Sequence, residues 1–239
     1  MSEGKKVAIL QSNYIPWKGY FDLMAKVDEF IIYDEVQYTK NDWRNRNKIK
    51  TPQGVKWLSI PVHTKGHISN AVRIVDAEIV DGRWAKSHWN TIVQNYGKSQ
   101  YFHEYAGRLE QLYSECENEK LLCKVNYRFL YAIADILGID TKISFSSDYG
   151  LVDGKTERLV DLVSKAGGDE YLSGPAAKDY IEENLFADAG IKLSWMDYSG
   201  YPEYPQLYPP FEHCVSILDL IFNCGPGAWK YMKGVHNGF

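Results

Sequence analysis

VAILQSNYIPWKGYFDLMAKVDEFIIYDEVQYTKNDWRNRNKIK, residues 7–50, decides the fold of this chain. The stretch begins with an apolar run at 7–10, turns at Pro16 and Gly19, has apolar residues at helical spacing over 17–27, and returns to an apolar run at 30–33. A strand, a helix and a second strand in this order predict a βαβ unit with two parallel strands. Because open α/β sheets bind ligands at the carboxyl ends of their strands, residues 11–22 and 34–50 are the first place to look for a site.

The rest of the chain extends this unit into a layered fold. Strands are predicted at 56–62, 142–147, 170–174 and 192–198, with further strand structure at 72–75 and 77–80, and helices at 83–95, 100–116, 120–137, 156–166, 176–186 and 215–222. Segment 199–211 has too many prolines for regular structure. We expect an α/β fold: a layered, mostly parallel sheet with flanking helices, Rossmann-like, with a nucleotidyltransferase-like first βαβ unit. Residues 1–239 should form a single compact domain with a mainly helical insertion at 83–138, and whether the late strands join the first sheet stays open.

Composition excludes several classes of protein. The 239 residues are 45% hydrophobic and 24% charged, as in ordinary globular proteins. No apolar run approaches the roughly 18 residues of a membrane span and no signal peptide is evident, so we expect a cytoplasmic protein without membrane insertion. The net charge of −4 argues against nucleic acid as the main partner. The four scattered cysteines fit neither a disulfide framework nor a zinc site, and we expect no metal and no cofactor.

The turn after the first strand is the first candidate site. Its side chains can donate to an anion resting on the start of the following helix. The turn is similar in position to the P-x-H-x-G-H turn of adenylyl and cytidylyl transferases, but Trp17 and Tyr20 stand where those enzymes have histidines. An ordinary βα turn with a buried tryptophan is the structural alternative. The candidate anion ligands here are Gln11, Ser12, Asn13 and Lys18.

The second candidate site follows the second strand. A phosphate or pyrophosphate beside a flat ring would suit its mixture of cations, amides and aromatic rings, although a solvated basic loop is the alternative. We expect two neighbouring loops at the carboxyl edge to grip an anion jointly through Lys18, Lys40, Arg44 and Arg46. The amide and aromatic residues of this segment are Gln37, Tyr38, Asn41, Trp43 and Asn45.

Candidate bases are a carboxylate and a histidine. Asp34 follows the apolar run FIIY at the mouth of the expected crevice, where partial desolvation raises a carboxylate pKa. Asp22 is its rival. His88, on a predicted helix, and His213, before the last helix, could each remove a proton near neutral pH.

The remaining histidines and the later turns carry weaker signals. His63, His67, His103 and His236 look peripheral. Ser173, after the strand EYL, could bring backbone N–H groups to a ligand from the opposite half of the sheet. Cys224 is the one thiol that could be a nucleophile. We expect instead that it is a structural thiol packed at the end of a helix.

Several segments together resemble the WbqC-like protein family: AILQSNYIPWKGYFDL, DEVQYTKNDWRNRNKIKTPQG, KSHWNTIVQNYGKS, YLSGPAAKDY and FEHCVSILDLIFNCGPG. Members of that family occur among bacterial genes for O-antigen and related surface polysaccharides, and glycyl or other acyl transfer to an amino sugar has been proposed for them. The resemblance implies a cytoplasmic transferase that acts on a nucleotide-linked amino sugar with an acyl or aminoacyl donor. The matching motif residues are Gln11, Asn13, Pro16, Trp17, Gly19, Tyr20, Asp22, Asp34, Gln37, Tyr38, Arg44, Asn45 and Arg46.

This reading assigns roles to residues as hypotheses. Asp34 or His88 would act as base, Asn13 or Arg44 would polarise the carbonyl, and Lys40 and Arg46 would hold phosphate. Two alternatives stay open: an ATP-dependent ligase or nucleotidyltransferase-like enzyme, and a non-catalytic glycan- or protein-binding factor of polysaccharide assembly. The expected substrate-binding residues are Gln11, Trp17, Lys18, Tyr20, Gln37, Tyr38, Lys40, Asn41, Asn45, Arg46 and Ser173.

Overall fold

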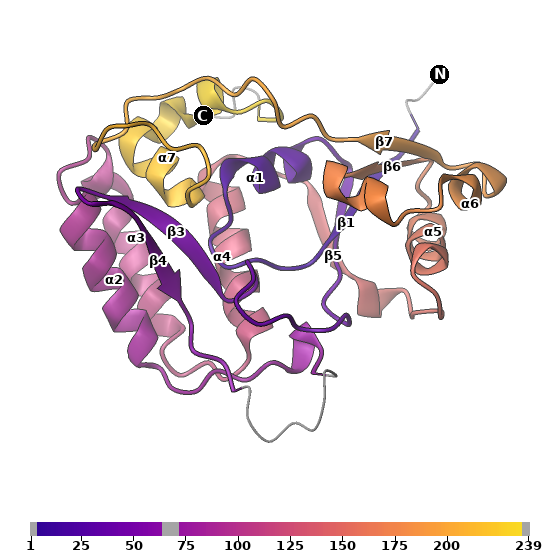
Figure 1. Ribbon diagram of the computed structural model, residues 1–239, viewed down its shortest axis with the longest axis horizontal. Helices are drawn as coiled ribbons and strands as arrows, with labels where there is room; N and C mark the ends of the chain where they lie inside the picture. The colour runs from indigo at the N-terminus through magenta and orange to yellow at the C-terminus, as the bar shows by residue number, and fades with distance from the viewer. Residues whose placement is uncertain (1–3, 64–71, 236–239) are drawn as a thin grey trace.

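A five-stranded parallel sheet forms the centre of the protein in the computed structural model, which describes residues 4–63 and 72–235 (Figure 1). Its strand order is β5-β2-β1-β6-β7. The late strands therefore join the first sheet, with β6 beside β1. His67 and His236 lie outside the described residues. The strands are β1 (Lys6–Leu10), β2 (Glu29–Ile32), β5 (Lys142–Phe145), β6 (Glu170–Ser173) and β7 (Lys192–Trp195).

Helices cover both faces of this sheet. Because side chains alternate along a strand, Ala8 of β1 faces the core that contains α1 (Lys18–Ala25) and α4 (Leu122–Ile136), whereas Val7 and Ile9 face α5 (Thr156–Lys165) and α6 (Glu183–Asp188). Figure 1 shows α1 and α4 on one side of the strands and α5 and α6 on the other. The expected α/β fold with a layered parallel sheet is confirmed.

The chain changes direction between β1 and β6. After β1 it continues into α1 on one face, and after β6 it continues through the 3₁₀ turn Pro175–Asp179 into α6 on the opposite face. The connections of these two adjacent strands therefore diverge at their carboxyl ends. Such a topological switch point leaves a crevice in which α/β proteins bind ligands.

A β-hairpin and three further helices form the other half of the molecule (Figure 1). The hairpin consists of β3 (Arg46–Thr51) and β4 (Gly54–Ser59), and the helices are α2 (Arg83–Tyr96), α3 (Phe102–Glu115) and α7 (Ile217–Cys224). The second half of the basic segment is thus a strand rather than the expected loop. Arg46, Lys48 and Lys50 alternate along β3 and share one face of the hairpin. The many charged residues made this segment resemble a solvated loop, so the strand was not predicted.

Segment 72–80 differs from the prediction of strands. It forms a 3₁₀ turn, Ile74–Asp76, and isolated bridges. Its backbone N–H groups donate to carbonyls of three separate segments: those of Asp34 and Val36, of Lys120 and of Pro61. No continuous ladder can form when the partners come from different directions. The helix expected at 176–186 is likewise divided between the 3₁₀ turn after β6 and α6.

The amino edge of the sheet carries an alternating row of charges. In spatial order the first residues of the five strands are Lys142, Glu29, Lys6, Glu170 and Lys192. Glu170 lies 3.7 Å from Lys6 and 3.1 Å from Lys192. Since like charges on adjacent strands repel, this row disfavours strand orders that would place two of the lysines or the two glutamates side by side.

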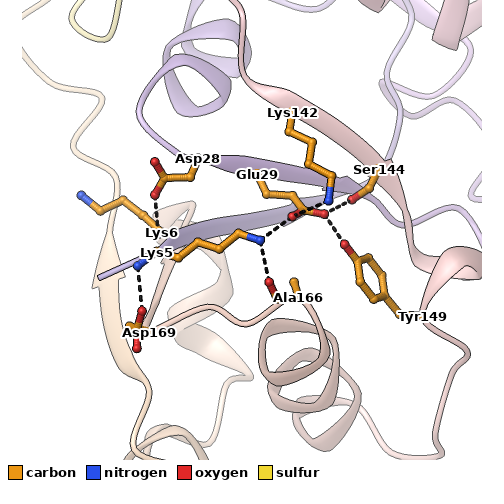
Figure 2. A network of polar contacts seen from close by, with 9 residues as sticks. All are labelled: Lys5, Lys6, Asp28, Glu29, Lys142, Ser144, Tyr149, Ala166 and Asp169. Carbon is orange, nitrogen blue, oxygen red and sulfur yellow. Dashed lines mark hydrogen bonds and ion pairs between the residues drawn. The ribbon is translucent and has the colours of Figure 1, made fainter. Parts of the chain in front are cut away.

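Glu29 is the centre of this edge (Figure 2). Its fully buried carboxylate accepts hydrogen bonds from Lys5 at 2.7 Å, Lys142 at 3.0 Å and the Ser144 hydroxyl at 2.6 Å, and from the Tyr149 hydroxyl. Burial alone would raise its pKa, but these donors outweigh burial and lower the pKa to about 2. The two glutamates at the amino edge are therefore paired with lysines of the protein itself.

Candidate functional site

A cavity of about 610 Å³ lies at the switch point. Gln11 and Asn13 line it from the end of β1, Ser173 and Gly174 from the end of β6, and Gly154 from the start of α5. Cavities of this size hold small-molecule ligands in other proteins. The sequence argument for a site beyond the carboxyl ends of the strands therefore leads to a real concavity.

The charged residues of the cavity lining are all cations. They are Arg44, Lys155 and Arg158, and no carboxylate lines the cavity among the described residues. Arg158 is held in place by donating to the Tyr33 hydroxyl at 2.7 Å and to the Val152 carbonyl at 2.7 Å. A lining that carries three positive charges and no carboxylate favours an anionic ligand.

Arg44 is positioned by the end of β1. Its guanidinium donates to the side-chain oxygens of Asn13 and of Gln11, the latter at 3.2 Å, and lies 3.6 Å from Asp42. Asn126, on α4, donates to the Arg44 carbonyl at 2.9 Å. These contacts orient the guanidinium before any ligand arrives, which reduces the entropic cost of binding.

The turn between β1 and α1 is locked by the hairpin. Asn47 of β3 donates to the carbonyls of Tyr14 at 3.2 Å and Ile15 at 3.0 Å. Ile15 has φ of 37°, an uncommon conformation for a β-branched residue that requires such support. Gly19 is required because a Cβ there would lie 2.3 Å from the Trp17 ring. The turn thereby fixes Trp17 as a wall of the cavity.

Asp34 is buried beneath this turn and does not line the cavity. Its carboxylate accepts from the backbone N–H of Ser12 at 2.8 Å and from the Ser12 hydroxyl at 2.6 Å. Burial raises the pKa of Asp34, and the Ser12 donors partly oppose that rise. The carboxylate thus holds the segment whose neighbouring residues, Gln11 and Asn13, face the cavity.

His88 lies in the helical half, away from the cavity lining. The Tyr14 hydroxyl is 2.9 Å from His88 Nδ1 and 2.8 Å from the Tyr113 hydroxyl, so the three side chains form a buried polar cluster. Burial lowers the pKa of His88 to about 4, and the ring is neutral at physiological pH. This environment is that of a buried, hydrogen-bonded histidine.

The four cations expected to act together are dispersed, which corrects the expectation of a joint grip. Lys18 is buried with its ammonium 4.7 Å and 5.2 Å from the rings of Tyr201 and Tyr204, and burial lowers its pKa to about 8. Arg46 stacks 4.1 Å from the ring of Trp57, and Lys40 is exposed. Of the four, Arg44 alone lines the cavity.

The remaining predicted residues divide into two groups. Gln11, Asn13, Trp17 and Ser173 line the cavity together with Arg44. The others lie outside the lining. The Tyr20 hydroxyl donates to the Gln11 carbonyl at 3.0 Å, and Asn45 donates to the Ile60 carbonyl at 2.9 Å. Gln37 forms a β-bridge with Arg73, Asn41 has φ of 60°, and Tyr38 packs against the core.

The residues held as alternatives also have structural partners or lie outside the cavity lining. Asp22 accepts the backbone N–H groups of Lys233 at 2.9 Å and Gly234 at 2.8 Å. Cys224 is buried, which raises the pKa of its thiol to about 12. His213 makes an edge contact with Phe211, with ring centroids 4.6 Å apart.

Lys155 and Arg158 were not among the residues predicted from sequence. They lie in the segment GKTER that starts the helix after β5. Open α/β sheets bind ligands at the carboxyl ends of their strands, and this rule applies to the connection after β5 as it does to the turn after β1. The sequence pattern lacked the order of the strands: the chain leaves β5 at the sheet edge and crosses through α5 to β6, which lies beside β1.

None of the helices in residues 4–63 and 72–235 is long and apolar enough to cross a membrane. No solved structure matches the chain. The uncharacterized protein Rv1507c of Mycobacterium tuberculosis is 51% identical over 230 residues, which cover 96% of this chain and 98% of that protein. The pattern of the WbqC-like protein family matches residues 11–231, and the chain belongs to that family.

Proposed function

We propose that the protein is a transferase that binds a nucleotide-linked amino sugar in the switch-point cavity and acylates its amino group. The observation that carries this proposal is the set of three cations, Arg44, Lys155 and Arg158, around a cavity whose described lining holds no carboxylate. A diphosphate carries the complementary charge, and arginine pairs with phosphate oxygens through two parallel hydrogen bonds.

Aromatic residues support the nucleotide and sugar parts of the proposal. Trp17, Trp43, Tyr33 and Tyr180 line the same cavity. Trp43 is 42% exposed and Tyr180 is 58% exposed, so both offer uncovered ring faces. Flat aromatic faces stack on bases and on the apolar faces of sugars.

The transfer step is supported by the pair Arg44 and Asn13. In this step the amine attacks the carbonyl carbon of an acyl or aminoacyl donor: the C–N bond forms, the bond from that carbon to the donor's leaving group breaks, and the amine proton passes through the base to the leaving group. Negative charge develops on the carbonyl oxygen, and fixed donors stabilise it. Arg44 is such a donor because Asn13 and Gln11 orient its guanidinium. That Asp34 or His88 removes the amine proton stays a prediction. A place in O-antigen or related polysaccharide synthesis, and a cytoplasmic location, are part of the proposal.

Calorimetry with a panel of ligands tests the binding part. The panel contains inorganic pyrophosphate, UDP, dTDP, GDP, the corresponding nucleosides, and UDP-glucosamine as a nucleotide-linked amino sugar. We expect diphosphates to bind at least about 10-fold more tightly than nucleosides, without a requirement for Mg²⁺, because the cations supply the binding energy. Equal affinity for nucleosides and diphosphates would contradict the proposal.

The two alternatives predict different outcomes of the same screen. Binding of ATP or CTP that depends on Mg²⁺, with release of pyrophosphate, would favour the ligase or nucleotidyltransferase. Binding of a glycan or protein that survives the double change Asp34→Asn and Arg44→Gln would favour the non-catalytic factor.

A further inference from the structure

A second, smaller cavity adjoins the first. It measures about 170 Å³ and is lined by Asn13, Pro16, Trp17, Trp43, Asn47 and Cys214. None of these six side chains carries a charge at neutral pH, and most of the lining is apolar. The smaller cavity therefore differs in chemistry from its cationic neighbour.

The two cavities share part of their walls. Asn13, Trp17 and Trp43 line both of them. Arg44 lines the larger cavity and donates to the side-chain oxygen of the shared Asn13. The fixed donor of the larger cavity thus lies at the boundary with the smaller one.

The smaller cavity is a built feature of the fold. Asn47 belongs to β3 and is 2% exposed. Its side-chain amide also donates hydrogen bonds to two carbonyls of the turn between β1 and α1. Trp17 is fixed by Gly19 and by edge contact with Tyr198 at 5.1 Å between ring centroids. The walls come from three segments far apart in the sequence, so the cavity does not depend on one surface loop.

We propose that the smaller cavity is the subsite for the transferred group, and that it takes a small, uncharged acyl or amide moiety. This inference rests on the proposed function and names the chemistry of its second substrate. A volume of about 170 Å³ admits a group of a few heavy atoms and excludes a nucleotide. The absence of lining charge in this part of the described structure disfavours a carboxylate or ammonium group, whose desolvation would be uncompensated.

Nuclear magnetic resonance of the tryptophan indoles tests this assignment. The chain has seven tryptophans, and each gives one indole N–H signal. The probe is propionamide, a neutral amide, and sodium propionate is its charged counterpart. Cys214→Phe fills the smaller cavity, and Val93→Phe adds the same ring at an exposed position on α2 as a control.

Trp17 and Trp43 also line the cationic cavity, where propionate can bind, so the smaller cavity is monitored by the part of their shift that Cys214→Phe removes. We expect this part of the response to be saturable and at least about threefold larger for propionamide than for propionate. Val93→Phe should retain it. An equal part for both probes, no response to propionamide, or a propionamide response that Cys214→Phe leaves unchanged would overturn the inference.

Pyrophosphate binding, measured by calorimetry on the same proteins, separates this inference from the proposed function. Pyrophosphate affinity should be the same within about twofold in the wild type and in Cys214→Phe. If pyrophosphate fails to bind the wild type while the propionamide response is as expected, the proposed function fails and the neutral subsite stands. If pyrophosphate binds and propionamide gives no response, the subsite assignment fails by itself.

Discussion

The two edges of the central sheet carry charge in opposite ways. At the amino edge the first residues of the five strands alternate in sign, and Glu29 is surrounded by four donors. At the carboxyl edge Arg44, Lys155 and Arg158 line a cavity whose described lining has no carboxylate. Charges that are paired within the protein stabilise the fold, whereas an excess of one sign in a cavity is available to a ligand.

One edge of the sheet therefore contributes mainly to stability, and the other contributes mainly to binding. A change at the amino edge should alter unfolding and leave binding intact, and removal of the cations that line the cavity should chiefly alter binding. Each of the following predictions tests one side of that separation.

The largest expected effect comes from removing the cavity cations together. Changing Arg44, Lys155 and Arg158 to Gln should weaken pyrophosphate binding by at least about 100-fold, because each charged hydrogen bond contributes roughly 1.5–3 kcal/mol. Calorimetry measures the affinity. The free energy of unfolding should fall by less than about 2 kcal/mol, because the glutamines can replace part of the hydrogen bonds that Arg44 and Arg158 donate within the protein.

The matched control removes three exposed lysines outside the cavity. Lys86, Lys98 and Lys124 changed to Gln alter the net charge equally. If this control weakens binding as much as the cavity variant, the net charge rather than the cavity governs affinity, and the proposed site is wrong.

Glu29→Gln should have the largest effect on stability. The change leaves Lys5, Ser144 and Tyr149 without their shared carboxylate. We expect a loss of about 2 kcal/mol in the free energy of unfolding, reduced from the full cost of a broken buried pair because Lys5 can reach solvent. For a chain of this size that corresponds to a fall in Tm of about 4–8 °C, measurable by calorimetry.

Glu170→Gln is the comparison for this variant. Its side chain is 17% exposed and its lysine partners Lys6 and Lys192 are more exposed, so the loss should stay below about 1 kcal/mol. Pyrophosphate affinity should be unchanged in both glutamate variants. A large loss of affinity in Glu29→Gln would show that the two edges are coupled.

Asp34→Asn should have a smaller effect on stability, of about 1–2 kcal/mol, since the buried Ser12 donors lose a charged acceptor. Pyrophosphate affinity should fall by less than about threefold, because Asp34 does not line the cavity. Urea denaturation and calorimetry measure the two effects. Loss of product formation at unchanged affinity would instead support the prediction that Asp34 is the base.

The pH dependence of Glu29 gives the subtlest effect. Its pKa is lowered from 4.5 to about 2 in the folded state, so the folded protein favours the ionised form. The stabilisation is complete above pH 4.5 and is lost as the pH falls toward 2. The difference in unfolding free energy between wild type and Glu29→Gln should therefore shrink over this range. A difference that grows on acidification would contradict the lowered pKa.

Local patterns predicted much of the fold. The apolar runs and helical spacing in residues 7–33 gave the first βαβ unit, and strand ends gave Gln11 and Asn13 as cavity residues. Side-chain direction was less accessible. Lys18 lies at the first position of α1, but it packs against Tyr201 and Tyr204, which are far away in the sequence.

Strand order was the other missing information. Lys155 and Arg158 reach the cavity because β6 pairs with β1 and α5 packs beside them. Periodicity indicates that strands exist, but it does not say which strands are neighbours. For Asp34 the sequence indicated a partly desolvated position at the mouth of the crevice, whereas the carboxylate is buried beneath the turn and accepts two hydrogen bonds from Ser12.

The crystal structure of the protein with inorganic pyrophosphate tests the central claim most directly. We predict that phosphate oxygens lie within about 2.7–3.2 Å of side-chain nitrogens of Arg44, Lys155 and Arg158, between the carboxyl ends of β1 and β6. Pyrophosphate bound at another surface, with these three side chains making no contact to it, would contradict the account.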